Sequence, residues 1–301
     1  YRAIYRALGL DERIENLILL STAANFVNVI APSAGVGGIA VFVTDARRKG
    51  YSGGRVTVAG VLFVLFEYAA ILGVLALGLL VLVRRNNLTS AEIIASSLLL
   101  VIAVVMTALM ILGARSEKGL GQVLSWMARS VNYVLQPFIH RPYLSEARAH
   151  EFAHDAAAGL KKVRSQPKRL VLPALLALSS KALLISVLLM TFLAFGVPYS
   201  VGTIIAGFSI GYLFLIVSPT PAGIGVVEGA LTLALTSLTV PLGDAAIITL
   251  AYRGITFWLP LPMGMLAFRL ISNREKISPV VGADERKTHF RGKYSLLESP
   301  L

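Results

Sequence analysis

Long apolar stretches constrain this chain more than any other feature of its sequence. Residues 56–83, 91–113 and 170–195 are the clearest of them, and each exceeds the roughly 18 apolar residues that indicate a membrane-crossing helix. Inside hydrocarbon, only helices and closed barrels satisfy all backbone polar groups. The 301 residues are 56% hydrophobic and 15% charged, whereas soluble domains average about 25% charged. The sequence therefore predicts an all-α, polytopic helical membrane protein.

One apolar region, residues 201–238, is interrupted by residues that oppose a simple crossing helix. Prolines remove backbone donors and disfavour helix in the residue before them, and glycines permit backbone shapes that other residues resist. The interrupting residues are Pro219, Pro221, Gly223 and Gly225. Broken backbone at membrane depth is tolerated only where it is buried in protein or lines a watery cavity. We therefore expect this stretch to line a binding site or a path.

A similar break occurs near the N-terminus. Ala34-Gly35-Val36-Gly37 resembles Ala222-Gly223-Ile224-Gly225 at an offset of 188 residues, and each motif has a proline upstream, Pro32 in the first case. Asn25 and Asn28 precede the first break. Each break is open to two interpretations, a kinked full crossing or a re-entrant hairpin with its tip at residues 32–38 or 219–225. We favour two hairpins in an inverted repeat, a common transporter plan with its site at the midplane.

Charge distribution orients the chain. Residues 114–169 hold ten Lys or Arg against four acids, so the positive-inside rule places this amphipathic linker in the cytoplasm. Residues 1–16 are expected to form an interfacial helix, and one or two further helices are expected to precede it. We predict a transmembrane domain over residues 1–275 of a multi-pass protein of the cell inner (plasma) membrane, with a charged cytoplasmic tail at 276–301.

Ionisable residues lie within several of the apolar segments. Glu67, Lys181 and Arg253 each sit near the middle of one, and Glu228 follows the second break. A charge at a helix centre costs about 2.5–3.5 kcal/mol on insertion scales, so such groups face inward and mark function by default. Two interpretations remain open: structural ion pairs between the carboxylates and the cations, or cations that meet a lipid phosphate while the carboxylates act as counter-charges. Both can hold.

Other chemistry is less well supported. His150-Glu151-Phe152-Ala153-His154 matches the HExxH zinc motif, but it lies in the basic linker without an evident third ligand, so we interpret it as a solvated helix and expect no metal or cofactor. The chain has no cysteine, which excludes thiol chemistry. The net charge of +12 flanks apolar helices, so anionic lipid headgroups, rather than nucleic acid, are the expected partners.

Two segments carry a family resemblance. Residues 221–229 (PAGIGVVEG) and 251–260 (AYRGITFWLP) resemble the lysylphosphatidylglycerol synthase transmembrane family, the flippase-like membrane domain of the multiple peptide resistance factor. Residues 25–38 and 47–50 agree less specifically. The chain departs from the family at Ala222, where Gly is frequent, and at Tyr68, where an arginine often follows the acid.

The resemblance implies a domain that moves an aminoacylated or other anionic phospholipid, or a polyprenyl-phosphate-type lipid, between leaflets. In the resistance factor the synthase is a separate soluble domain, so we expect no enzymatic activity here. The alternative is a non-transporting accessory or scaffold protein of a lipid or glycan pathway. A second copy of the chain or a lipid-pathway enzyme is the protein partner left open by the sequence.

Overall fold

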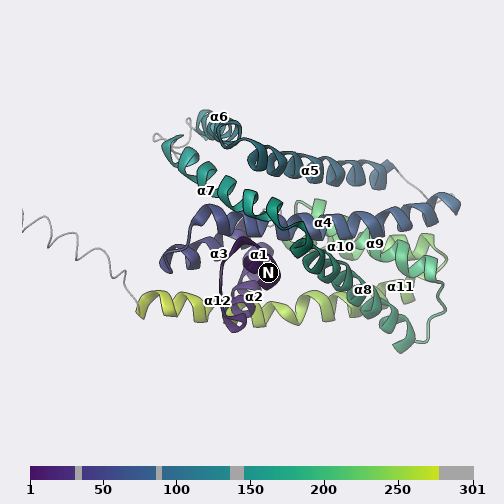
Figure 1. Ribbon diagram of the computed structural model, residues 1–301. Helices are drawn as coiled ribbons and strands as arrows, with labels where there is room; N and C mark the ends of the chain where they lie inside the picture. The colour runs from purple at the N-terminus through teal and green to yellow at the C-terminus, as the bar shows by residue number, and fades with distance from the viewer. Residues whose placement is uncertain (31–35, 86–89, 136–145, 278–301) are drawn as a thin grey trace, which may run out of the picture.

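The computed structural model describes residues 1–30, 36–85, 90–135 and 146–277, and these residues contain helices but no β-strand (Figure 1). Four helical segments are long and apolar enough to cross a membrane, namely Gly53–Arg84, Glu92–Arg115, Pro167–Ala194 and Leu242–Asn273. The predicted all-α, multi-pass membrane fold is therefore confirmed. The α-helices are α1 (Arg2–Leu8), α2 (Ile14–Ile30), α3 (Val36–Arg48), α4 (Gly53–Arg84), α5 (Ser90–Arg115), α6 (Glu117–Leu135), α7 (Glu146–Ser165), α8 (Val171–Ala194), α9 (Val201–Val217), α10 (Val226–Ser237), α11 (Leu242–Arg253) and α12 (Pro260–Ile277).

Helices α2 and α3 form an antiparallel hairpin. The Asn16 side chain donates to Asp45 (3.2 Å) near the open end of the hairpin, and the backbone N–H of Gly38 donates to Asn28 Oδ1 (2.6 Å) near the turn. With 17 and 13 residues, the two helices extend about 26 and 20 Å at 1.5 Å per residue. Neither spans a hydrocarbon core of about 30 Å. The turn itself, at 31–35, lies outside the described residues.

Helices α9 and α10 form a second hairpin around the broken stretch. Gly207 faces Leu235 and Gly211 faces Leu231, so the two helices run antiparallel. Between them lies a short 3₁₀ turn, η2 (Pro221–Gly223). Positive φ angles at Gly223 (71°) and Gly225 (81°) explain why glycine occupies these positions. The α9 and α10 helices contain 17 and 12 residues, so they too are short for a crossing.

The two hairpins have their open ends at opposite ends of α4. At the start of α4, Tyr51 Oη donates to the Asp11 carbonyl (2.7 Å) beside the first hairpin. At its end, Arg85 donates to Ser200 Oγ (3.1 Å) and to the Leu238 carbonyl (3.5 Å) of the second. Helix α2 contacts η2, so the hairpins meet in the interior. The open ends of the two hairpins thus lie at opposite ends of the long helix α4.

The expected helix over residues 1–16 is wrong. Helix α1 ends at Leu8 because Gly9 adopts φ 71°, and α2 begins only at Ile14. Ile4 and Leu8 are buried against α4 and α7, since their apolar side chains match that core. Arg2 and Arg6 remain exposed.

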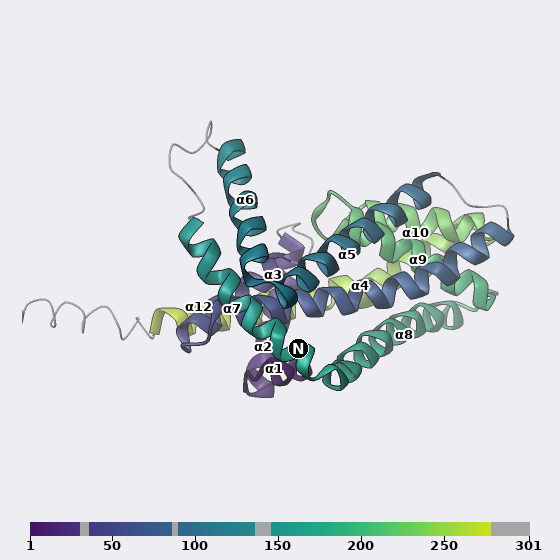
Figure 2. The ribbon, with the colours of Figure 1, turned by 45° about the horizontal axis from the view of Figure 1, so that its top comes forward.

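The linker is more structured than its composition indicates. Helices α6 and α7 pack against each other and project from the end of the bundle (Figure 2). Alanines on α7 allow close packing on α4: Ala153 and Ala156 are buried, and the Ser52 hydroxyl at the start of α4 donates to Asp155 (2.5 Å). The described residues of the predicted linker, 114–135 and 146–169, are therefore almost entirely helical, and α7 packs against the bundle.

Candidate functional site

A cavity of about 760 Å³ lies where the two hairpins meet. Its walls come from α2, α4, α8, α9, the residues around η2, α11 and the start of α12. Its polar lining residues are Asn25, Asn28, Glu67, Tyr68, Ser180, Lys181, Tyr212, Ser218, Thr220, Tyr252, Arg253 and Thr256. The cavity is partly open and mixes these polar side chains with apolar ones, and residues of the broken stretch, among them Pro219 and Ala222, form part of its wall.

The first charged cluster joins α4, α8 and α9. The Lys181 ammonium is bonded to the Glu67 carboxylate and to the Tyr212 hydroxyl (2.5 Å), and it lies 4.1 Å from the centre of the Tyr212 ring. The Lys181 side chain is 1% exposed, whereas Glu67 is 20% exposed. The pair is therefore open to the cavity mainly on the carboxylate side.

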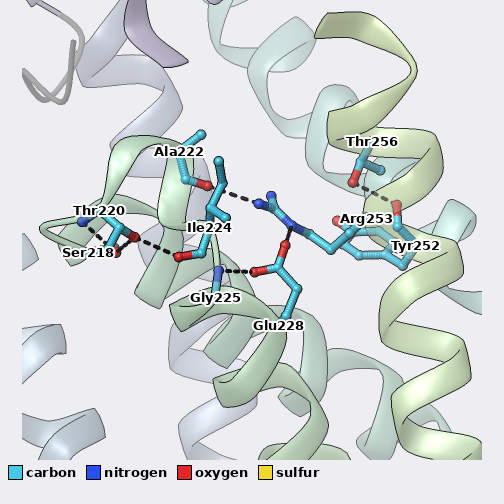
Figure 3. A network of polar contacts seen from close by, with 9 residues as sticks. All are labelled: Ser218, Thr220, Ala222, Ile224, Gly225, Glu228, Tyr252, Arg253 and Thr256. Carbon is cyan, nitrogen blue, oxygen red and sulfur yellow. Dashed lines mark hydrogen bonds and ion pairs between the residues drawn. The ribbon is translucent and has the colours of Figure 1, made fainter. Parts of the chain in front are cut away.

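The second cluster joins α11 to the second hairpin (Figure 3). Arg253 Nε donates to Glu228 Oε1 (2.7 Å), and its Nη2 donates to the Ala222 carbonyl (3.0 Å). The other Glu228 oxygen accepts the Gly225 N–H (2.7 Å) and so caps α10. Ala222 has φ 49°, a conformation that costs a non-glycine residue about 1–2 kcal/mol. Arg253 thus holds a strained turn in place.

Both clusters are internally neutral. Two cations and two carboxylates compensate each other, which lowers the cost of placing these charges out of water. Donors nevertheless remain, because Lys181 uses two of its three N–H groups and Arg253 uses two of its five in hydrogen bonds to described residues. Both cations are almost fully buried, so an anionic oxygen entering the cavity reaches these donors only as the carboxylates move aside.

The predicted site residues separate into three groups. Those on the cavity wall are Asn25, Asn28, Glu67, Lys181, Pro219 and Arg253. Those that shape the second tip without lining the cavity are Pro221, Gly223, Gly225 and Glu228. Pro32 and Gly35 lie outside the described residues, and Gly37 lies in the first turn of α3. Of the eleven predicted site residues that the structure describes, six from both halves of the chain thus line one cavity, whereas Gly37 and the four residues of the second tip do not.

Sequence reasoning missed two partners. Tyr212 lies in a strongly apolar helix. The one sequence signal for it was a polar hydroxyl in that helix, six residues before the broken stretch begins at Ser218. The Ala222 carbonyl carries no sequence signal as a ligand, because its role depends on the backbone of η2. Thr249, one turn before Arg253, is fully buried, and its hydroxyl has no hydrogen-bond partner among the residues that the structure describes.

The HExxH match behaves as a surface feature where its side chains are described. His154 Nδ1 is 2.7 Å from Glu117 Oε1 on α6, and both side chains are exposed. This hydrogen bond raises the pKa of His154 above its ordinary value. The His150 side chain lies outside the described set. Among described residues, no group of three His, Cys, Asp or Glu side chains is placed to hold a metal ion.

The family model for the lysylphosphatidylglycerol synthase TM region matches residues 1–264. No curated protein and no solved structure matches the chain. The match extends over both hairpins and all four charged residues of the two clusters. The chain therefore belongs to the family of the lysylphosphatidylglycerol synthase transmembrane region, a family of membrane proteins associated with lipid handling.

Proposed function

We propose that this protein moves an anionic or aminoacylated phospholipid, or a polyprenyl-phosphate-type lipid, between membrane leaflets. The observation that carries the proposal is the cavity, which brings Lys181 and Arg253 from separate helices to the meeting point of two hairpins. Such intramembrane charges default to a functional role. The family match supports lipid handling, and the proposal adds movement across the bilayer.

In this mechanism the lipid phosphate enters the cavity and the acyl chains stay in the bilayer. The phosphate competes with Glu67 and Glu228 for Lys181 and Arg253, whose remaining N–H groups then donate to it as well. An amino group on the headgroup, where present, pairs with a carboxylate released in this exchange. The two hairpins, re-entrant from opposite sides, provide alternating access by inverted repeats.

A translocation assay in liposomes tests the proposal. Fluorescent phosphatidylglycerol and fluorescent phosphatidylcholine are incorporated separately, and a membrane-impermeant quencher reports the lipid that reaches the outer leaflet. We expect wild-type protein to accelerate translocation, and Arg253→Ala and Lys181→Ala to reduce the rate at least about tenfold, since each loses a charge-assisted hydrogen bond worth roughly 1.5–3 kcal/mol. Arg84→Ala, at the exposed end of α4, is the matched control.

Two outcomes would overturn the proposal. Translocation by Arg253→Ala and Glu67→Ala at the wild-type rate would place the path elsewhere. No translocation by well-folded wild-type protein, together with stable capture of a lipid-pathway enzyme, would favour the accessory function. Localisation in the inner membrane, with residues 114–169 and the tail in the cytoplasm, belongs to the same proposal.

A further inference from the structure

Seven exposed cations gather where α1, the end of α7 and the 3₁₀ turn η1 (Pro167–Leu170) pack together. We call them the α1–η1 basic patch. Its members are Arg2, Arg6, Lys161, Lys162, Arg164, Lys168 and Arg169. The patch lies outside the central cavity, whose lining includes none of these residues.

Contacts between segments far apart in the chain bring these cations together. Arg169 donates to the Arg6 carbonyl (3.4 Å). Lys162 Nζ lies so close to Gly9 that a Cβ on that residue would stand 2.0 Å from it. The packing of α1 with α7 and η1 therefore places cations from distant segments of the chain in one region of the surface.

Carboxylates do not offset this charge in the described part of the chain. None of the seven cations forms an ion pair there. Asp11 and Glu12 follow α1, but Glu12 is bound to Lys49 (2.9 Å). Like charges gathered without direct ion pairs repel one another, so an anion that binds here relieves this repulsion.

The position of the patch identifies the kind of anion. Immediately after Arg169, α8 begins a face of exposed apolar side chains, with Val171 57%, Leu172 56% and Leu175 59% exposed. Such a face suits hydrocarbon, so the cations before it lie at the level of the lipid headgroups. At 1.5 Å per residue, Lys181 lies about 18 Å further along α8, close to the middle of a core of about 30 Å.

We infer that the α1–η1 basic patch is a binding site for the phosphate of anionic phospholipids in the adjacent leaflet. The lipid chains lie against the exposed face of α8, and the headgroup contacts the cations of α1, α7 and η1. This site concentrates anionic lipid beside the helix that carries Lys181. Binding at the patch does not require translocation, so the inference holds or fails independently of the proposed function.

A proximity measurement in nanodiscs tests the site. Because the chain has no cysteine, Ser165→Cys carries a single fluorophore beside the patch. Nitroxide-headgroup phosphatidylglycerol or phosphatidylcholine, diluted into phosphatidylcholine nanodiscs, quenches it. We expect severalfold stronger quenching by phosphatidylglycerol, falling with added salt. A membrane-surface cation contributes about fivefold to anionic lipid binding, so Arg6→Gln, Lys162→Gln and Arg169→Gln together should lower this preference by more than about tenfold.

The control removes equal charge elsewhere, with Arg84→Gln, Arg115→Gln and Lys118→Gln, all at exposed positions. We expect this triple variant to keep the preference. A second patch variant, Lys161→Gln, Arg164→Gln and Lys168→Gln, tests the site without the contacts of Arg169 and Lys162, should the first variant fold poorly. Equal quenching by both lipids in wild-type protein, or equal loss in patch and control variants, would overturn the inference.

Discussion

Glu228 carries out two tasks at the scale of a single residue. One oxygen neutralises Arg253, and the other caps α10 through the Gly225 N–H. Glu67 forms the corresponding ion pair with Lys181. Each carboxylate thus stabilises a cation that sits almost fully out of solvent, with Lys181 1% and Arg253 4% exposed.

Removing one partner of a buried pair should cost more than removing both. Breaking such a pair costs about 3–5 kcal/mol, whereas apolar replacement of the whole pair is often neutral. We expect Glu67→Leu to lower the melting temperature of the purified protein and Lys181→Met added to it to restore most of the loss. Lipid translocation should be lost in both. If the double variant is no more stable than the single one, the unpaired Lys181 charge is not the cause of the loss.

His154 provides a pH-dependent contact. Its bond to Glu117 raises the pKa of the imidazole, so the charged form favours the α6–α7 contact. This contribution is complete below the ordinary imidazole pKa and is lost as pH rises through the raised one. In a histidine NMR titration, Glu117→Gln should return the midpoint towards the ordinary value. An unchanged midpoint would exclude the Glu117 contact as the cause.

At the scale of elements, close approach of α4 and α9 depends on Gly78. A Cβ at Gly78 would lie 2.4 Å from Ser209 Oγ and 2.6 Å from its Cβ, whereas one at Gly73 on the same helix would meet nothing within 4 Å. We expect Gly78→Ala to destabilise the protein by about 1–3 kcal/mol through overpacking. Gly73→Ala should be neutral or stabilising by up to about 1 kcal/mol. Thermal unfolding in detergent compares the two variants, and indistinguishable melting temperatures would refute this packing argument.

The last helical segment shows what local sequence can predict. Prolines at 260 and 262 predict a kink, and the structure places a π-helical turn, η3 (Gly254–Trp258), just before them. Pro260 has no N–H and cannot donate to the carbonyl four residues earlier. The preceding Leu259 N–H bonds to the carbonyl of Gly254, five residues earlier (2.9 Å), which is the π-helical pattern. Asp244 is of a residue type that often caps a helix start, but α11 begins at Leu242 and places Asp244 in its first turn.

At the scale of the whole molecule, the two halves share an order of elements. Helices α2 and α9 each contain 17 residues, with starts 187 residues apart, close to the motif offset. Helix α4 packs on α9, and α12 packs on α2. This pairing of helices supports the proposed inverted repeat. It also suggests a test of which side of the membrane each hairpin opens to.

Single cysteines test the orientation of the hairpins, since the chain contains none. Asp11→Cys lies beside the open end of the first hairpin, and Gly243→Cys follows the second, both at exposed positions. We expect an impermeant maleimide to label Asp11→Cys from the same side as Ser165→Cys, and Gly243→Cys from the opposite side with Arg84→Cys. Labelling of Asp11→Cys and Gly243→Cys from one side would exclude hairpins that enter from opposite faces.

Apolar length and charge predicted the membrane fold because both act locally along the chain. The long crossings at 56–83, 91–113 and 170–195 correspond to α4, α5 and α8 within a few residues. The pairing of Glu67 with Lys181 and of Glu228 with Arg253 was left open, because it depends on which helices pack together. The burial of α1 and α7 was missed for the same reason, since short amphipathic segments fit both a membrane surface and a protein core.

The bond from Arg253 to the Ala222 carbonyl makes the second hairpin tip a reporter of occupancy. An anion that draws the Arg253 guanidinium away breaks its hydrogen bond to the Ala222 carbonyl. The turn at Ala222, which has a positive φ, then loses that restraint. Thermodynamic reciprocity then requires that whatever loosens the turn also changes the affinity for that anion, by the same factor. A spectroscopic label beside Ala222 would therefore measure ligand binding, and substitutions in the turn would tune it without touching the ligand.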